Sequence, residues 1–367
     1  MQVKPCHRPN RHLDARVQSR RSTLAAMRLR AFPAAALAAL ALATGLPRTI
    51  HAQASSFAPG ARVLLDAHNA YPYEGRFADR VSRALATGLP VAIEQDLIWR
   101  AGADGAGDSV VGHDLDKVAD APTFQAYFFE AIAPVMEQAL REAHRDRWPL
   151  IVLNLDFKTD EPAHHARVLQ VLRQHERWLT SAPRTATPGQ PAPMTVGPLL
   201  VLTGSNPTQQ THFHDDLAEG DRIRLFGAIT QPEPSGETAR DRARALFAMT
   251  PDALIASKAT NYRRWVNFPW HVVELGGQAQ AGAWTPADRA RLDALVGRAH
   301  AQDLWIRFYT LNGHAAPDAD TQGWSKGYNF GDLDAATRRW KAAREAKVDF
   351  VATDQYEAFD RAGGGKD

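Results

Sequence analysis

Between residues 63 and 114, three apolar runs each carry acidic or imidazole side chains, and this stretch most constrains how the chain can fold. The runs read V-L-L-D-A-H-N-A-Y, V-A-I-E-Q-D-L-I-W and S-V-V-G-H-D. Near-continuous apolar runs favour parallel strands that are buried on both faces. Glu94 and Asp96 lie two residues apart in the second run, so in a strand they point to the same face. Because burying two unpaired carboxylates side by side is costly, we expect a bound cation there.

A fourth run, I-V-L-N-L-D-F-K-T, places Asp156 and Lys158 at the end of another strand and on one face. A third carboxylate completes a site for a hard cation, Mg²⁺ or Ca²⁺, which prefers oxygen ligands. Lys158 offers a point charge to a phosphate oxygen. His68 and His113 end the first and third runs, and histidine exchanges protons near neutral pH. Together these residue types indicate metal-assisted phosphodiester chemistry.

Along the rest of the chain, apolar runs alternate with helical patterns. Apolar spacing predicts helices over 162–179, 285–300 and 333–346, the second of them with Thr285-Pro286 as cap and first residue. The expected strands are 62–67, 91–97, 150–156, 199–203, 223–229, 253–256, 305–310 and 348–352. This alternation predicts an α/β fold, a (β/α)8 TIM barrel in a single domain. Active sites of such barrels lie at the C-terminal ends of the strands.

The N-terminal segment predicts export. Residues 1–30 are rich in arginine, a short apolar run follows Met27, and Ala52-Gln53-Ala54 resembles a small-residue cleavage site. We therefore expect an N-terminal extension plus signal peptide over 1–54, cleaved near Ala54, with Met1 or Met27 as the start. The barrel domain then occupies 55–367, and the mature protein is periplasmic or secreted. The alternative is an amphipathic organelle transit peptide.

Removal of this leader changes the charge of the chain. Residues 1–54 hold nine Lys or Arg and one acidic residue, so residues 55–367 carry a formal net charge of −6. An acidic protein argues against nucleic acid as a partner. The only cysteine, Cys6, lies in the leader, so the mature chain would hold no disulfide. Roughly 310 remaining residues are enough for one large α/β domain.

The motifs H-N, E-x-D, G-H-D and D-x-K, in this order and at strand ends, resemble the PLC-like phosphodiesterase superfamily. That superfamily includes glycerophosphodiester phosphodiesterases and sphingomyelinase D-type phospholipases. The resemblance in strand and helix order runs from about Ala61 to Phe359, and the motifs are confined to 66–114 and 151–158. It implies a TIM barrel and an enzyme that cleaves the phosphodiester of a phospholipid or glycerophosphodiester.

The resemblance also implies roles for the residues above. His68 and His113 would be the acid–base pair, although a nucleophilic His68 stays open. Lys158 would bind phosphate, and Glu94, Asp96 and Asp156 would hold one divalent cation, Mg²⁺ or Ca²⁺. One departure concerns Asn69, since glycerophosphodiester phosphodiesterases usually carry arginine after the first histidine. Asparagine cannot grip phosphate with a charge, which moves the chain towards another branch of the superfamily.

Weaker candidates follow the late strands. Asn69, Trp305 and Asn312 are expected to bind substrate, and Tyr309 and Asp354 lie near the same strand ends; Lys258 is a further outside candidate. Each has a structural alternative, which is core packing for an aromatic residue and an ordinary ion pair for a lone charge. For the cluster from His212 to Asp216 we favour a solvated face over a metal site.

Two other functions compete with the phosphodiesterase. A glycoside hydrolase on a TIM barrel also carries paired carboxylates, but Glu94 and Asp96 lie on one strand, and histidines and a lysine are superfluous there. A non-catalytic barrel binding protein is the second alternative. The expected partners are a phospholipid or glycerophosphodiester substrate and at most a peripheral membrane contact, with a monomeric protein. Hydrolysis and formation of a cyclic phosphate are both compatible with the residues.

Overall fold

The computed structural model describes residues 57–363, except 74, 103–105, 143, 276–281 and 324–328. Contacts divide the chain into residues 1–51 and 52–367, and every described residue belongs to the second unit. The predicted signal peptide and the predicted boundary at residue 54 lie outside the described residues. None of the described helices is long and apolar enough to cross a membrane.

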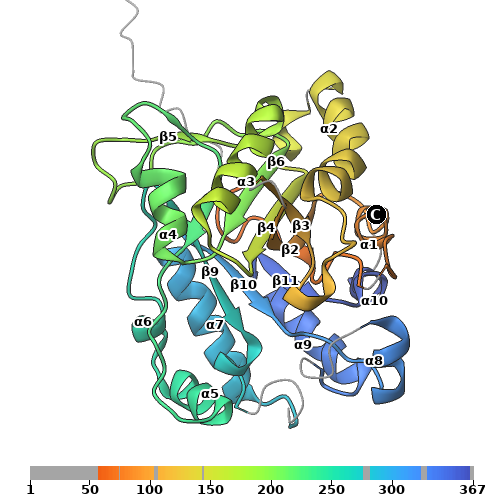
Figure 1. Cartoon of the computed structure of the whole chain (residues 1–367). Coiled ribbons are helices and arrows are strands. Elements are labelled where there is room, and N and C mark those ends of the chain that lie inside the picture. The colour runs from red at the N-terminus through yellow and green to blue at the C-terminus, as the bar shows by residue number, and fades with distance from the viewer. Residues whose placement is uncertain are drawn as a thin grey trace, which may run out of the picture. The chain divides into compact units, whose positions relative to one another are not determined.

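Eight parallel strands close on themselves to form a barrel, as the sequence predicts (Figure 1). The closing contact is between β1 and β2, where Asp66 pairs with Ala92 and Ala67 with Ile93. The barrel strands are β1 (Leu64–Ala67), β2 (Val91–Ala101), β4 (Ile151–Phe157), β6 (Leu199–Thr203), β8 (Phe226–Ala228), β9 (Arg263–Pro269), β10 (Trp305–Tyr309) and β11 (Phe350–Thr353). Closure leaves no free edge among these eight strands.

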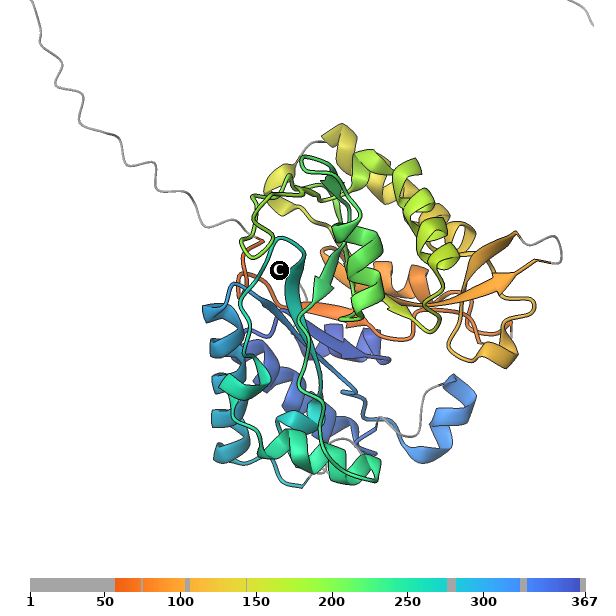
Figure 2. The same ribbon diagram turned by 60° about the vertical axis from the view of Figure 1, so that its left-hand side comes forward.

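One hairpin extends the sheet. The outer part of β2, from Leu97 to Ala101, pairs antiparallel with β3 (Gly107–Val111), and this ribbon projects beyond the barrel in orange (Figure 2). His113 follows directly after β3. The short strands β5 (Ala182–Pro183) and β7 (Arg222–Ile223) form a separate antiparallel pair.

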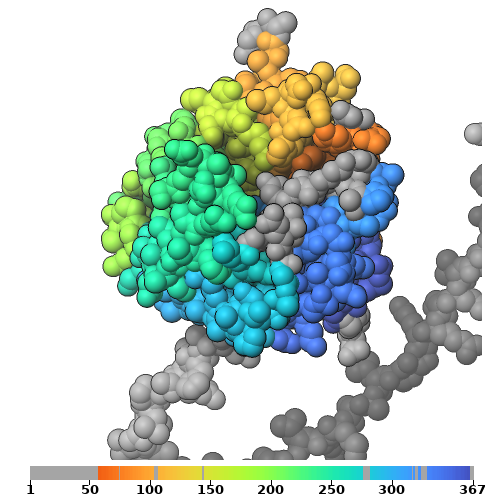
Figure 3. All heavy atoms as spheres, turned by 90° about the horizontal axis from the view of Figure 1, so that it is seen from below, coloured from red at the N-terminus to blue at the C-terminus, as the bar shows by residue number. Residues whose placement is uncertain are grey.

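Helices surround the strands and cover the outer face of the barrel (Figure 1). They are α1 (Arg80–Ala86), α2 (Glu130–Glu142), α3 (Pro162–Gln174), α4 (Pro207–Gln210), α5 (Ala239–Ala248), α6 (Pro251–Leu254), α7 (Pro286–Ala301), α8 (Ala316–Gln322), α9 (Leu333–Glu345) and α10 (Tyr356–Ala362). The predicted start of α7 is confirmed, because Thr285 and Asp288 form a reciprocal capping box ahead of Pro286. Segments from early, middle and late parts of the chain meet on the face seen in Figure 3.

The core is apolar between strands and helices and polar inside one end of the barrel. Ile93, Leu153 and Val201, from three neighbouring strands, are fully buried, and each such side chain contributes about 1.5–3 kcal/mol through burial. Inside the barrel, by contrast, Asp66 and Arg307 contact each other. The barrel therefore carries charged groups beneath its mouth.

One predicted strand is wrong. Residues 253–256 belong to α6 and the turn that follows it, because Thr250 caps the helix and Pro251 occupies its first position. The sixth barrel strand is instead β9, R-R-W-V-N-F-P, whose two arginines and final proline obscure the apolar pattern. Lys258 consequently lies before a barrel strand rather than after one, and it is exposed.

Candidate active site

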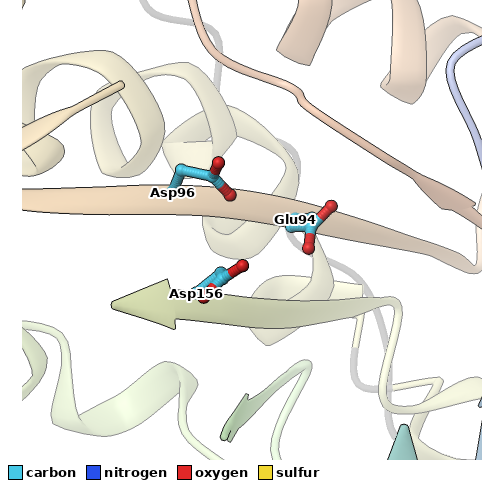
Figure 4. Close-up of side chains that lie close together, drawn as sticks. All are labelled: Glu94, Asp96 and Asp156. Atoms are coloured by element: carbon cyan, nitrogen blue, oxygen red, sulfur yellow. The ribbon is translucent and has the colours of Figure 1, made fainter. Parts of the chain in front are cut away.

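Three carboxylates meet between β2 and β4 (Figure 4). Asp96 and Asp156 are direct partners in the parallel register of these strands, so their side chains leave the sheet on the same face. Glu94 lies two residues earlier on β2. One oxygen from each of the three residues lies within 4.8 Å of the other two. Glu94 and Asp96 are buried, and Asp156 is exposed.

The two buried carboxylates of this cluster, Glu94 and Asp96, have pKa values shifted in opposite directions. Burial, followed by the charges of Glu94 and Asp156, raises the pKa of Asp96 well above its usual value. Burial also raises the pKa of Glu94, but the charges of Arg307, His68 and Lys158 outweigh burial and lower it to about 2. Asp96 thus lacks enough positive charge nearby, whereas Glu94 has it.

The donor set fits a hard divalent cation. All three groups are oxygen donors, which Mg²⁺ and Ca²⁺ prefer, and the lysine beside them compensates only part of their charge. Lys158 Nζ lies 2.8 Å from Asp156 Oδ2 and 3.2 Å from Asp96 Oδ2. Burial lowers the pKa of Lys158, but the charges of Asp96 and Asp156 outweigh it, so the pKa lies above its usual value. Lys158 therefore remains a cation beside the cluster.

His68 lies next to these carboxylates, just after β1. Its Nδ1 is 2.7 Å from Asp354 Oδ1, and its Nε2 is 3.4 Å from Glu94 Oε2. Burial lowers the pKa of His68, but the charges of Glu94 and Asp354, together with the hydrogen bond to Asp354, raise it to about 9. The imidazole is therefore fixed between Glu94 of β2 and Asp354, which lies just after β11.

The asparagines predicted to bind substrate both contact Asp354. Asn312 Nδ2 donates to Asp354 Oδ2 at 2.8 Å, and Asn69 Nδ2 donates to Asp354 Oδ1 at 2.9 Å. Asn69 adopts a positive φ of 54°, a conformation that asparagine tolerates better than most residues. Its own Oδ1 accepts from Tyr71 at 2.9 Å. Their observed contacts thus orient Asp354, and substrate binding by either asparagine stays a prediction.

His113 stands in a different setting. Its side chain is 52% exposed, and its Nδ1 lies 2.7 Å from Asp114 Oδ1. Lys117 Nζ lies 3.3 Å from the other oxygen of Asp114. His113 lines a pocket of about 550 Å³, together with Tyr73, Val118 and other residues of the loops after β1 and β3. This volume is within the range of small-molecule sites.

Trp305 and Tyr309 occupy opposite ends of β10. Trp305 begins the strand, and its ring lies 4.5 Å from that of Phe57, to whose carbonyl oxygen its Nε1 donates. Trp305 therefore lies at the N-terminal end of a barrel strand, whereas Asp96 and Asp156 lie late in theirs, so its position does not support the predicted contact with substrate. Tyr309 ends the strand, and its ring is nearly parallel to that of His68 with centroids 6.5 Å apart. Tyr309 therefore belongs to the wall of the site.

The histidine-rich segment 212–216 is only partly a solvated face. Phe213 and His214 are buried, and His214 Nδ1 lies 2.7 Å from Asp215 Oδ1. His214 is held in the interior by a polar partner of its own, since its Nε2 lies 3.2 Å from Asn261 Oδ1. Among the described residues, this segment forms no cluster suited to a metal ion.

Two buried residues of the site were not predicted from the sequence. Asp66, on β1, and Arg307, on β10, form an ion pair inside the barrel. Burial and the charge of Arg307 are the two largest influences on the pKa of Asp66, which lies above its usual value. The available signal was a single charge inside each apolar run, L-L-D-A and W-I-R-F-Y. A lone charge within a buried strand requires a partner, but the sequence does not name it.

Comparisons with known proteins find similarity only to solved structures, and at low sequence identity. No known protein family matches the sequence, and no curated protein does. A glycerophosphoryl diester phosphodiesterase from Parabacteroides distasonis is similar over 82% of this chain and 85% of its own, with 14% identity and a TM-score of 0.37. The wild-type HPPK-DHPS of Plasmodium falciparum is similar over 83% of this chain, with 9% identity and a TM-score of 0.38. The match spans 46% of that second protein. Likeness at this level assigns neither protein's reaction to this chain.

Proposed function

We propose that this chain is an exported phosphodiesterase that depends on a divalent cation and cleaves a phospholipid or glycerophosphodiester. The observation that carries the proposal is the meeting of Glu94, Asp96 and Asp156 within 4.8 Å at the mouth of the barrel, beside His68 and Lys158. Oxygen donors, a fixed cation and an oriented imidazole are the groups that phosphoryl transfer needs.

Glu94, Asp96 and Asp156 would hold one Mg²⁺ or Ca²⁺. When bound, the cation supplies positive charge that stabilises the negative charge of the phosphate in the transition state. Lys158 adds the chain's own positive charge 2.8 Å from Asp156, where it would contact a non-bridging oxygen of the phosphate.

His68 and His113 would exchange protons with the substrate. One imidazole accepts the proton of the attacking hydroxyl or water as its oxygen bonds to phosphorus. The other donates a proton to the alcohol oxygen as the old P–O bond breaks. Each histidine has Nδ1 on an aspartate oxygen at 2.7 Å, which fixes the ring and directs Nε2 away from that carboxylate. Either assignment of acid and base satisfies this arrangement.

The pocket beside His113 would receive one alcohol arm of the diester. It adjoins an imidazole that can protonate the leaving oxygen, and its volume of about 550 Å³ accommodates a group larger than methyl. Val118 contributes apolar surface, and Tyr73 contributes a hydroxyl. Analysis of the reaction products identifies this alcohol.

The first experiment measures hydrolysis of bis-(p-nitrophenyl) phosphate after EDTA treatment and after return of Mg²⁺ or Ca²⁺. We expect EDTA to abolish the activity, either cation or both to restore it, and Asp156→Asn to reduce it at least tenfold. Asp252→Asn is the matched control, because Asp252 is an exposed acid whose described ion pair is with Arg298 on α7. Full activity in EDTA contradicts the proposal.

The second experiment separates the possible products. ³¹P NMR of reactions with a panel of phospholipids and lysophospholipids distinguishes a phosphomonoester from a cyclic phosphate. Glycosidase activity that survives EDTA would instead favour the glycoside hydrolase. The geometry gives that alternative little support, because Asp96 and Asp156 are neighbours on adjacent strands, whereas glycosidase carboxylates flank the sugar from opposite sides.

A further inference from the structure

Arg307 crosses the inside of the barrel beneath the proposed cation site. It lies on β10 and is 1% exposed. Its Nε donates to Asp66 of β1, and one terminal nitrogen donates to Asn267 Oδ1 of β9 at 3.0 Å. The other terminal nitrogen lies 3.2 Å from Glu94 Oε2 of β2. A single guanidinium therefore joins three strands besides its own.

The contact with Glu94 is selective for one oxygen. Besides Arg307, the neighbours of Glu94 Oε2 are His68 Nε2 at 3.4 Å and the backbone nitrogen of Asn69 at 3.3 Å. The Asn69 N–H donates a hydrogen bond to Oε2, and His68 and Arg307 lie within ion-pair distance of the same oxygen. The terminal nitrogen of Arg307 that faces Glu94 forms no hydrogen bond within the described part of the chain, so its contact with Oε2 is an ion pair alone. Because these three contacts are all made to Oε2, they favour one orientation of the carboxylate, and none of them occupies Oε1.

We propose that Arg307 is a positioning residue of the cation site, which orients Glu94 from inside the barrel so that its second oxygen can join those of Asp96 and Asp156. This inference rests on the proposed function. Arginine suits the task because its planar group presents donors in fixed directions to several acceptors at once. Lysine offers a point charge and would reach fewer of them.

A purely structural role for Arg307 is the competing explanation. Arg307 and Asp66 are both buried, and removal of one would leave the other unpaired, which destabilises a fold whatever the function. Asp66 Oδ1 has no hydrogen-bond partner within the described part of the chain, so the pair is not arranged to satisfy Asp66 completely. A test must therefore separate loss of stability from loss of cation binding.

Four variants make this separation. Arg307→Met removes the guanidinium, and Arg307→Met combined with Asp66→Asn removes the charge that would be left unpaired. Arg307→Lys retains the positive charge. Arg264→Met is the matched control, because Arg264 is also buried, lies on the neighbouring β9 and donates to the carbonyl oxygen of Ala192. Mn²⁺ is the probe: its dissociation constant is measured by electron paramagnetic resonance on metal-stripped full-length protein, and Tm is measured on the same samples.

We expect the double variant to recover most of the Tm lost in Arg307→Met, yet to bind Mn²⁺ about tenfold more weakly than wild type or worse, as for other residues that orient metal ligands. Arg307→Lys should bind with intermediate affinity. Arg264→Met should lower Tm and leave the Mn²⁺ affinity unchanged. Wild-type Mn²⁺ affinity in the double variant overturns this inference and leaves the proposed cation site intact. If the double variant does not fold, wild-type Mn²⁺ affinity in Arg307→Lys has the same meaning. Wild-type protein that binds no Mn²⁺ overturns the proposed cation site and this inference with it.

Discussion

His68 and His113 make the same contact with an aspartate, but the first pair is buried and the second is exposed. In both, Nδ1 lies 2.7 Å from an aspartate oxygen. The aspartate of His68 is 3% exposed and is held by two asparagines. The aspartate of His113 is 33% exposed, and Lys117, which lies 3.3 Å from that aspartate, is 35% exposed. One pair is thus locked into the barrel, and the other lies on a surface loop.

This difference teaches what burial adds to the same hydrogen bond. Water screens an exposed pair and competes for its hydrogen bonds, so such a pair contributes little to stability. A buried pair cannot be broken without leaving an uncompensated charge. We therefore expect the two histidines to matter equally for activity and very unequally for folding.

The largest expected effect concerns activity. His68→Gln and His113→Gln should each reduce kcat for bis-(p-nitrophenyl) phosphate by about 100-fold to 10,000-fold, because each removes a group that exchanges a proton. Only His68→Gln should also lower the free energy of unfolding, by about 3 kcal/mol, because it leaves Asp354 without its imidazole. Steady-state kinetics and urea unfolding measure the two quantities. Equal losses of stability in both variants would break the comparison.

The two aspartates sharpen the comparison further. Asp354→Asn should lower kcat about 100-fold, because residues that orient a functional group typically contribute 10–100-fold. Asp114→Asn should lower kcat only a few-fold, because the exposed imidazole can reorient through water. The unfolding free energy should fall clearly in the first variant and stay within about 0.5 kcal/mol of wild type in the second. A larger kinetic loss in Asp114→Asn would contradict this ranking.

A third histidine tests whether burial or the carboxylate governs the response to pH. His164, on α3, is buried, with Nε2 2.8 Å from the hydroxyl of Ser109 and Nδ1 2.9 Å from that of Thr159. Burial dominates here and lowers the pKa of His164 to about 4. Burial beside two carboxylates has the opposite outcome at His68, whose pKa is raised to about 9.

The sign of the effect follows from linkage. The folded chain keeps His164 neutral down to about pH 4, whereas the unfolded chain binds the proton from about pH 6.5. The contribution of His164 is therefore complete above pH 6.5 and is lost as pH falls towards 4, by up to about 3 kcal/mol. Urea unfolding between pH 7 and 4.5 measures the slope. His164→Gln should flatten it, and an unchanged slope in that variant would refute the assignment.

Local spacing in the sequence predicts which carboxylates share one face of a strand, but it does not predict which charged groups pair across the barrel. Period-two spacing was enough to place Glu94 and Asp96 on one face, because alternation is a local property of strands. The pairing of Asp66 with Arg307 joins strands 241 residues apart, and no local pattern encodes such a contact. Strand β9 was missed for a related reason: Arg264 is buried in it, because a partner from a distant segment, the carbonyl oxygen of Ala192, accepts its hydrogen bond.

The smallest expected effect is the dependence on salt. Raising NaCl from about 0.05 M to 0.5 M shortens the Debye length from about 14 Å to about 4 Å, which weakens the ion pairs of Asp114 with His113 and Lys117 but hardly reaches Asp354. The kinetic deficit of Asp114→Asn relative to wild type should therefore shrink as salt rises, whereas that of Asp354→Asn should stay constant. Ratios of kcat between each variant and wild type, measured across the salt series, cancel general effects of salt on the reaction. If the kcat ratios of the two variants changed in parallel with salt, exposure would not distinguish the His68–Asp354 pair from the His113–Asp114 pair. The loop around His113 would then be as well shielded from solvent ions as the interior of the barrel.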